Sequence, residues 1–256
     1  MNVKDISTAI ERLAPLSFQE EYDNAGLQTG FMGSEVRGIL VCLDITEDII
    51  EEAHRKGLDL IVSHHPLIFR KLARVSDETY QQRCVCKALS YGITLYSAHT
   101  NLDNAKGGVN HKIAELLGLH DLDWLVSNGE SGSGIIGNLP DRLPAEAFLD
   151  KDKATFRVHT LRHSAITSPT VQRIAVCGGA GAFLSSDARA KGADCFITGE
   201  LHYHDYFESE GMLLVELGHY ESEQFTCDLL HDYLAGEFPS LRIEITDINT
   251  NPIEQR

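Results

Sequence analysis

Residues 36–66 read VRGILVCLDITEDIIEEAHRKGLDLIVSHHP, and their pattern indicates the fold class. The stretch begins with branched apolar residues, Val36–Leu43, which predict a buried strand. Thr46 can cap a following helix that starts with acidic residues, and Gly57 can end it. Leu58–Ser63 is again typical of a strand. A strand, a helix and a second strand in this order predict a βαβ unit with parallel strands.

The same alternation continues along the chain. A helix is expected before Gly92, a strand at Ile93–Ala98, and an amphipathic helix that ends at Gly118. Further strands are expected at 171–177, 194–198 and 212–217, and further helices at about 183–191 and 221–234. We therefore expect an α/β protein with mostly parallel sheets.

The two halves of the chain are similar. Ile39–His65 aligns with Ile174–Glu200 at a constant offset of 135, with 7 identities in 27 positions. The identities extend over a whole strand–helix–strand unit, which indicates an internal duplication. Between the halves, Ser127–Gly134 (SNGESGSG) is polar and glycine-rich, as a connection would be. We expect a first α/β lobe at 1–126 and a second at 127–256, with no inserted middle domain.

Composition and charge disfavour several classes of protein. The chain has 256 residues, with 22 Lys and Arg against 38 Asp and Glu, a formal net charge of −16. Because nucleic-acid affinity rests on neutralising phosphates, binding to nucleic acid is disfavoured. No apolar run approaches the ~18 residues of a membrane span, and no signal-peptide pattern begins the chain, so we expect a cytoplasmic protein. The six scattered cysteines form no C-x-x-C and indicate buried, reduced thiols.

Side chains of the types that can bind metals follow the expected strands. They are His64 and His65, His99 with Asp103, Glu200 with His202 and His204, and His219 with Glu223. Because ligands bind beyond the carboxyl ends of parallel strands, we expect these side chains to gather. Imidazole and carboxylate suit zinc, iron, manganese, nickel or cobalt, and these segments lack the cysteines of a closed zinc site. These candidate ligands outnumber the positions around one tetrahedral ion. One carboxylate can bridge two ions roughly 3.5–4 Å apart, so a site for two ions is expected.

Each feature also has a simpler structural interpretation. The pair His64 and His65 can be a strand end closed by proline, Asp103 a turn residue, and Glu223 an acid favoured near a helix start. His202 and His204 are more simply explained as solvent-facing or as neighbours of a ligand. The remaining histidines are interpreted as surface residues; they are His54, His111, His120, His159, His163 and His231.

The glycine-rich segment Cys177–Ala182 (CGGAGA) lies between a strand and a helix, as phosphate-binding loops do. It contains neither the Gly-Lys-Ser/Thr of a Walker loop nor a complete G-x-G-x-x-G. Two interpretations stay open at this point: a structural turn, or a backbone anion site for a nucleotide-like substrate.

Five motifs in order carry a resemblance to a known family. They are DNAGL at 23–27, IVSHHPLIF at 61–69, AHTNLD at 98–103, ITGEL at 197–201 and GHY at 218–220 followed by Glu223. The sequence resembles the NGG-interacting-factor-three-like family, whose members are often named GTP cyclohydrolase 1 type 2 homologues. The resemblance implies two similar lobes facing each other across a dinuclear metal cleft, and a toroidal homohexamer. It also implies that the metal ligands are His64, His65, Asp103, His219 and Glu223, with Glu223 bridging.

These observations lead to one functional hypothesis and one alternative. The hypothesis is a GTP cyclohydrolase-like hydrolase with two divalent metal ions per subunit, zinc, iron, manganese or nickel. Its small-molecule substrate would be nucleotide-like, a cyclic amide or a phosphoester. His99 and Glu200 are the candidates for proton transfer or for orienting a ligand. The alternative is a non-catalytic metal-binding scaffold or interaction protein.

Overall fold

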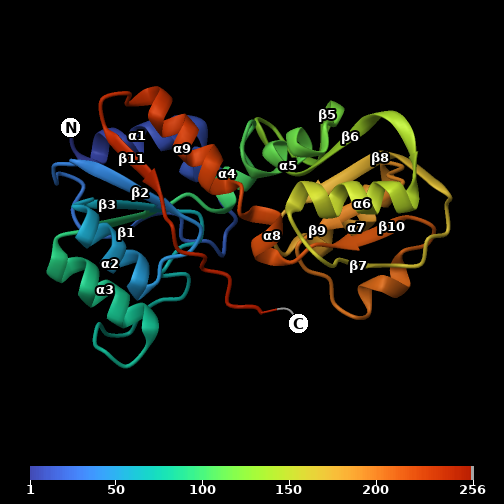
Figure 1. Ribbon diagram of the computed structural model, residues 1–256. Helices are drawn as coiled ribbons and strands as arrows, with labels where there is room; N and C mark the ends of the chain where they lie inside the picture. The colour runs from blue at the N-terminus through green and yellow to red at the C-terminus, as the bar shows by residue number, and fades with distance from the viewer. Residues whose placement is uncertain (255–256) are drawn as a thin grey trace. The chain divides into compact units, whose positions relative to one another are not determined.

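The computed structural model describes residues 1–254, which form two compact α/β units (Figure 1). The first unit contains Met1–Leu102 and the chain from Thr226 onward, and the second contains Asp103–Phe225. Each unit has its own sheet, so the expected α/β class is confirmed. The division differs from the expected boundary between residues 126 and 127, because the chain returns to the first unit after completing the second.

The first unit has a five-stranded sheet in the order β1-β4-β3-β2-β11. The strands are β1 (Gly26–Thr29), β2 (Gly38–Cys42), β3 (Leu60–Ser63), β4 (Thr94–Ser97) and β11 (Arg242–Ile245). Strands β4, β3, β2 and β11 are parallel, and β1 is antiparallel to β4. The helices are α1 (Val3–Leu13), η1 (Leu16–Phe18), α2 (Glu47–Lys56), α3 (Tyr80–Tyr91), α4 (Thr100–Asp103), whose last residue begins the second unit, and α9 (Thr226–Glu237).

The second unit has a six-stranded sheet in the order β5-β6-β8-β9-β10-β7. The strands are β5 (His120–Asn128), β6 (Ser131–Pro144), β7 (Arg162–His163), β8 (Thr170–Cys177), β9 (Cys195–Thr198) and β10 (Leu213–Glu216). The centre, β8-β9-β10, is parallel, and the outer pairings are antiparallel. The helices are α5 (Val109–Leu117), α6 (Ala145–Phe156), η2 (Gly181–Leu184), α7 (Ser185–Ala190), η3 (Asp205–Glu208) and α8 (His219–Glu223).

The elements with the clearest sequence signals form as expected. Thr46 caps α2 by accepting a hydrogen bond from the amide of Ile49 at 3.3 Å, and Gly57 ends that helix with φ of 68°. Gly118 ends α5 in the same left-handed conformation, with φ of 70°. Strands β2, β3, β4, β9 and β10 are buried at every position. Burial of both faces explains why apolar residues predominate in their sequences without a polar alternation.

The strand register supports the internal duplication. Ile39 pairs with Leu60 in the first sheet, and Ile174 pairs with Cys195 in the second. Both partners are thus related by the offset of 135 found in the sequence. The two aligned segments form the same parallel strand pair in the two units.

Two sequence predictions were wrong. Ser127–Gly134 is not a connection between lobes: Asn128 pairs with Ser131 across a two-residue turn that joins the antiparallel strands β5 and β6. Asn and Gly suit such a tight turn as well as they suit a linker. The single helix expected at about 221–234 is two helices, α8 and α9, because the second unit ends at Phe225 between them.

The expectation of buried, reduced thiols holds for five of the six cysteines. All six cysteines are free, and only Cys86 is exposed. None of the helices in residues 1–254 has the length and apolar character that a membrane span requires. In the first unit the apolar core joins β2, β3 and β4 to α2 and α3, which fixes the strand ends that carry the polar residues described next.

Candidate metal centre

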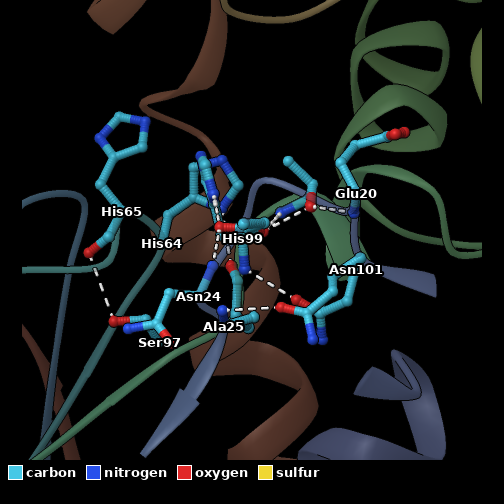
Figure 2. Close-up of polar contacts among 12 residues, drawn as sticks. Glu20, Asn24, Ala25, His64, His65, Ser97, His99 and Asn101 are labelled. Carbon is cyan, nitrogen blue, oxygen red and sulfur yellow. Dashed lines mark hydrogen bonds and ion pairs between the residues drawn. The ribbon is translucent and has the colours of Figure 1, made fainter. Parts of the chain in front are cut away.

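Three histidines of the first unit lie together beyond the ends of β3 and β4 (Figure 2). His64 and His65 directly follow β3, and His99 follows β4. The ring centroids are 4.9 Å apart for His64 and His65, 5.3 Å for His64 and His99, and 5.5 Å for His65 and His99. One ring nitrogen from each lies within 4.8 Å of the others, close enough to hold a metal ion. The parallel strands thus bring these histidines together as expected.

Each of these three rings has its Nδ1 atom within hydrogen-bond distance of an oxygen. The pairs are His64 with the backbone oxygen of Ala98 at 2.8 Å, His65 with Asp44 at 2.7 Å and His99 with Asp23 at 2.7 Å. A backbone carbonyl or a carboxylate can only accept, so Nδ1 must carry the proton. An imidazole with its proton on Nδ1 has its lone pair on Nε2, which is then the atom that can bind a metal.

The two aspartates in this arrangement are ionised at neutral pH. Burial acts to raise the pKa of Asp44, but the hydrogen bond and charge of His65 outweigh it, so the pKa lies below its ordinary value. Burial also opposes the shift at Asp23, where the hydrogen bond and charge of His99, with a hydrogen bond from Thr100, lower the pKa to about 2. Both side chains therefore act as acceptors.

Polar side chains hold the loops beneath the histidines (Figure 2). The amide of His99 donates to Oδ1 of Asn101 at 2.9 Å, and Nδ2 of Asn101 donates to the backbone oxygen of Ala14 at 2.7 Å. The hydroxyl of Ser97 donates to the backbone oxygen of His65 at 3.3 Å. These bonds fix the backbone from which the rings project.

In the second unit, His219 and Glu223 lie on α8, which begins just after β10. Nε2 of His219 is 3.2 Å from a carboxylate oxygen of Glu223, the proximity that the (i, i+4) spacing predicts. Nδ1 of His219 lies 2.8 Å from Oε1 of Glu200, which follows β9. His219 therefore shares with the other three histidines an Nδ1 atom close to an acceptor, and its Nε2 lies close to the candidate ligand Glu223.

The glycine-rich loop after β8 packs against this pair. Three of its amides donate to side chains: Gly178 to Asn110, Gly179 to Ser222 and Gly181 to Thr198, each at 3.0 Å. A Cβ atom on Gly179 would lie 2.4 Å from Oε1 of Glu223, and φ at Gly179 is +59°. The loop thus makes room for the Glu223 carboxylate, and its bonded amides favour the structural turn over a phosphate-binding loop.

Asp103 lies in the same neighbourhood of the second unit. Burial, reinforced by the charges of Asp103 and Glu223, raises the pKa of the Cys177 thiol, so both carboxylates act on one sulfur atom. The backbone oxygen of Asp103 accepts a hydrogen bond from Nδ2 of Asn110 at 3.1 Å. Asn110 also holds the glycine-rich loop, and it thereby connects the loop around Glu223 to the end of α4.

Two histidines near these strand ends do not join the gathered side chains. The side chain of His202 is 91% exposed and lies 3.5 Å from Asp205. The ring of His204 contacts those of Tyr203 and Phe207. Neither belongs to a group within the described residues that could hold an ion.

The sequence reasoning missed Asp44 and Asp23. Asp44 directly follows the first expected strand, as the candidate histidines follow theirs, so its position could have indicated a role. Asp23 is part of the DNAGL motif, which carried the resemblance but no assigned role. Their partners lie 21 and 76 positions away in the chain, a distance over which no local spacing rule applies.

The donor atoms suit a divalent transition metal. Imidazole Nε2 and carboxylate oxygens are the ligands of zinc, iron and manganese sites, and the space beside Gly179 is shaped for a carboxylate. Fold and donors together define an α/β protein with groups of histidine and acidic side chains that could hold a metal ion.

The chain belongs to the DUF34/NIF3 family. The model of that family, described as Duf34/NIF3 (NGG1p interacting factor 3), matches residues 1–252. A relative from Clostridium acetobutylicum, named GTP cyclohydrolase 1 type 2 homolog, is 34% identical over 95% of this chain and 93% of its own length. A relative of the same name from Lactococcus lactis is 34% identical over 98% of both chains. A crystal structure of a hypothetical Staphylococcus aureus protein matches with a TM-score of 0.95 and 27% identity, covering 100% of this chain and 99% of that one.

Proposed function

We propose that this protein is a divalent-metal-dependent hydrolase similar to a GTP cyclohydrolase. In this proposal the ligands of two ions are His64, His65, Asp103, His219 and Glu223, with Glu223 bridging. The observation that carries it is that three of these residues are histidines whose Nδ1 atoms are all occupied by acceptors. With the proton on Nδ1, Nε2 is the ring atom that can bind a metal.

Bound divalent ions would supply Lewis acidity and activate water for hydrolysis at neutral pH. The chain's own contribution is to hold the donors and to move protons. His99, whose Nδ1 lies 2.7 Å from Asp23, keeps a ring nitrogen within the histidine group and is the candidate for proton transfer. Glu200, bonded to His219 and 55% exposed, is placed to orient that ligand or to exchange protons with solvent.

The name of the curated relatives favours a small molecule with a nucleotide-like ring as substrate. Water attack on a ring amidine, a cyclic amide or a phosphoester would use the same set of groups. The toroidal homohexamer stays a prediction of the family resemblance, and the cytoplasmic location stays a prediction from the sequence pattern. Analytical ultracentrifugation tests the first, with a mass of six chains as the expected result.

The test of this proposal is turnover by the metal-loaded protein on GTP, a cyclic amide and a phosphodiester. We expect hydrolysis of at least one of them, and a loss of about 10²–10⁴-fold in kcat for His99→Ala, because a general acid or base contributes that much. The matched control is His231→Ala, a partly buried histidine on α9 whose Nδ1 lies 3.0 Å from Oδ1 of Asp232. Metal-loaded protein that turns over none of these substrates, while metal alters only its stability, would favour the non-catalytic scaffold.

A further inference from the structure

The chain after β11 reaches the histidine group through one aspartate. Thr250 donates its hydroxyl to Oδ2 of Asp44 at 2.7 Å. Oδ1 of the same carboxylate lies 2.7 Å from Nδ1 of His65. One side chain thus connects a candidate ligand to a segment far along the chain, since Thr250 lies 206 positions after Asp44.

The segment that carries Thr250 is itself held against the first unit. The amide of Thr246 donates to the backbone oxygen of Val41 at 2.9 Å, and the amide of Asp247 donates to Glu52 at 3.2 Å. Ile248 packs against the apolar core of the unit. Thr250 therefore projects from an anchored backbone, and its hydroxyl can fix the orientation of the Asp44 carboxylate.

We propose that Asp44, oriented by Thr250, is a positioning residue for His65. It holds the proton on Nδ1 and fixes the plane of the ring, so that Nε2 is directed to the ion. This inference rests on the proposed function, since it requires that His65 be a metal ligand. It adds two residues, Asp44 and Thr250, that are not ligands themselves. Thr250 lies in the last segment of the described chain.

A second contact of the same form supports a role in positioning. Asp23 accepts from the hydroxyl of Thr100 and, at 3.1 Å, from its amide, both on Oδ2. The Oδ1 atom of Asp23 lies 2.7 Å from Nδ1 of His99. Two neighbouring histidines are thus each oriented by an aspartate whose other oxygen is held by a threonine, although the four partners come from separate segments.

The packing of Asp44 does not require its carboxylate. Its side chain is 34% exposed, so truncation would leave space that water can enter rather than a closed cavity. The effect of removing it should therefore fall on His65 more than on the fold.

The experiment compares Asp44→Ala and Thr250→Val with the wild-type protein. It measures the dissociation constant of Zn²⁺, the visible absorption of the Co²⁺-loaded protein, and the unfolding temperature of the metal-free protein. We expect Asp44→Ala to weaken Zn²⁺ binding about tenfold or more and to change the Co²⁺ spectrum. Thr250→Val should act in the same direction but less, and Thr250→Ser should restore the wild-type values. The metal-free variants should all stay folded, with at most a small fall in unfolding temperature from the lost hydrogen bonds.

The control variant is Thr167→Val, since the hydroxyl of this exposed threonine donates to the backbone oxygen of Gly211. It should match the wild type in all three measurements. Wild-type Zn²⁺ affinity and Co²⁺ spectrum in Asp44→Ala would overturn the inference and leave the proposed function standing. A wild-type protein that binds neither ion would overturn the proposed function, and this inference with it.

Discussion

Gly179 illustrates how the absence of one carbon atom makes room for a candidate ligand. Its left-handed backbone, with φ of +59°, costs a non-glycine residue about 1–2 kcal/mol, and a Cβ there would meet Glu223 at 2.4 Å. The carboxylate would have to move by enough to relieve that contact. The approach of Glu223 therefore explains the glycines at 178 and 179, while a Cβ on Gly181 would meet Cys177 and Thr198.

We predict that Gly179→Ala weakens Zn²⁺ binding by about tenfold or more, because a displaced ligand loses its geometry. Equilibrium dialysis of the variant against buffered Zn²⁺ measures this. Gly33→Ala is the control, since Gly33 has no atom within 4 Å of the added Cβ and no left-handed φ. An unchanged dissociation constant for Gly179→Ala would show that Glu223 is not a ligand that this site depends on.

Asp152 is a buried acid outside the candidate site. It lies on α6 with no exposed surface, and within the described residues neither carboxyl oxygen has a hydrogen-bond partner. Burial raises its pKa well above the ordinary value of 3.8, and the charge of Lys151 opposes this only in part. In the folded state the carboxyl therefore keeps its proton at pH values where the unfolded chain has lost it.

This difference makes a prediction about pH and stability. Because the folded state binds more protons, the free energy of unfolding falls as pH rises from about 4 toward the folded-state pKa. Asp152→Asn removes this titration. The free energy of unfolding of the variant, relative to that of the wild type, should therefore rise by up to about 1.4 kcal/mol for each unit of pH. Urea unfolding at several pH values between 4.5 and 7.5 measures the difference. A difference that does not vary with pH would contradict a protonated Asp152.

Of the candidate site, the sequence predicted the side chains with metal-binding chemistry and their place after strands. His64, His65, His99 and His219 could be found because their residue types recur at equivalent ends. The aspartates that hold two of them could not, because each meets its histidine only through the three-dimensional fold.

At the scale of the elements, local signals and burial decided what could be predicted. Strands buried on both faces are mainly apolar and were expected within a few residues of their observed ends. Strand β5 is exposed at most positions and has no such run, so it was not expected. Strand β11 pairs Arg242 with Gly38, a contact between distant segments that no local pattern indicates.

The cap of α2 gives a prediction at this scale. Thr46→Ala removes the acceptor for the amide of Ile49 and should lower the free energy of unfolding by about 1 kcal/mol. Thr46→Ser retains a hydroxyl and should lose much less. Denaturant titration of both variants measures the effect, and equal losses would mean that the hydroxyl does not act as a cap.

At the scale of the whole molecule, the chain builds two α/β units by duplication and returns to the first to complete its sheet. Both units place histidine or acidic residues beyond the ends of their parallel strands. The alignment at an offset of 135 anticipated this repetition, while the return of the chain depends on the pairing of β11 with β2.

The metal content of the purified protein tests the central claim most directly. After loading with Zn²⁺ and removal of free metal, inductively coupled plasma mass spectrometry should find about two ions per chain, as a dinuclear hydrolase site requires. Glu223→Ala and His65→Ala should each lose at least one of them. Wild-type protein with well under one ion per chain after such loading would contradict the account.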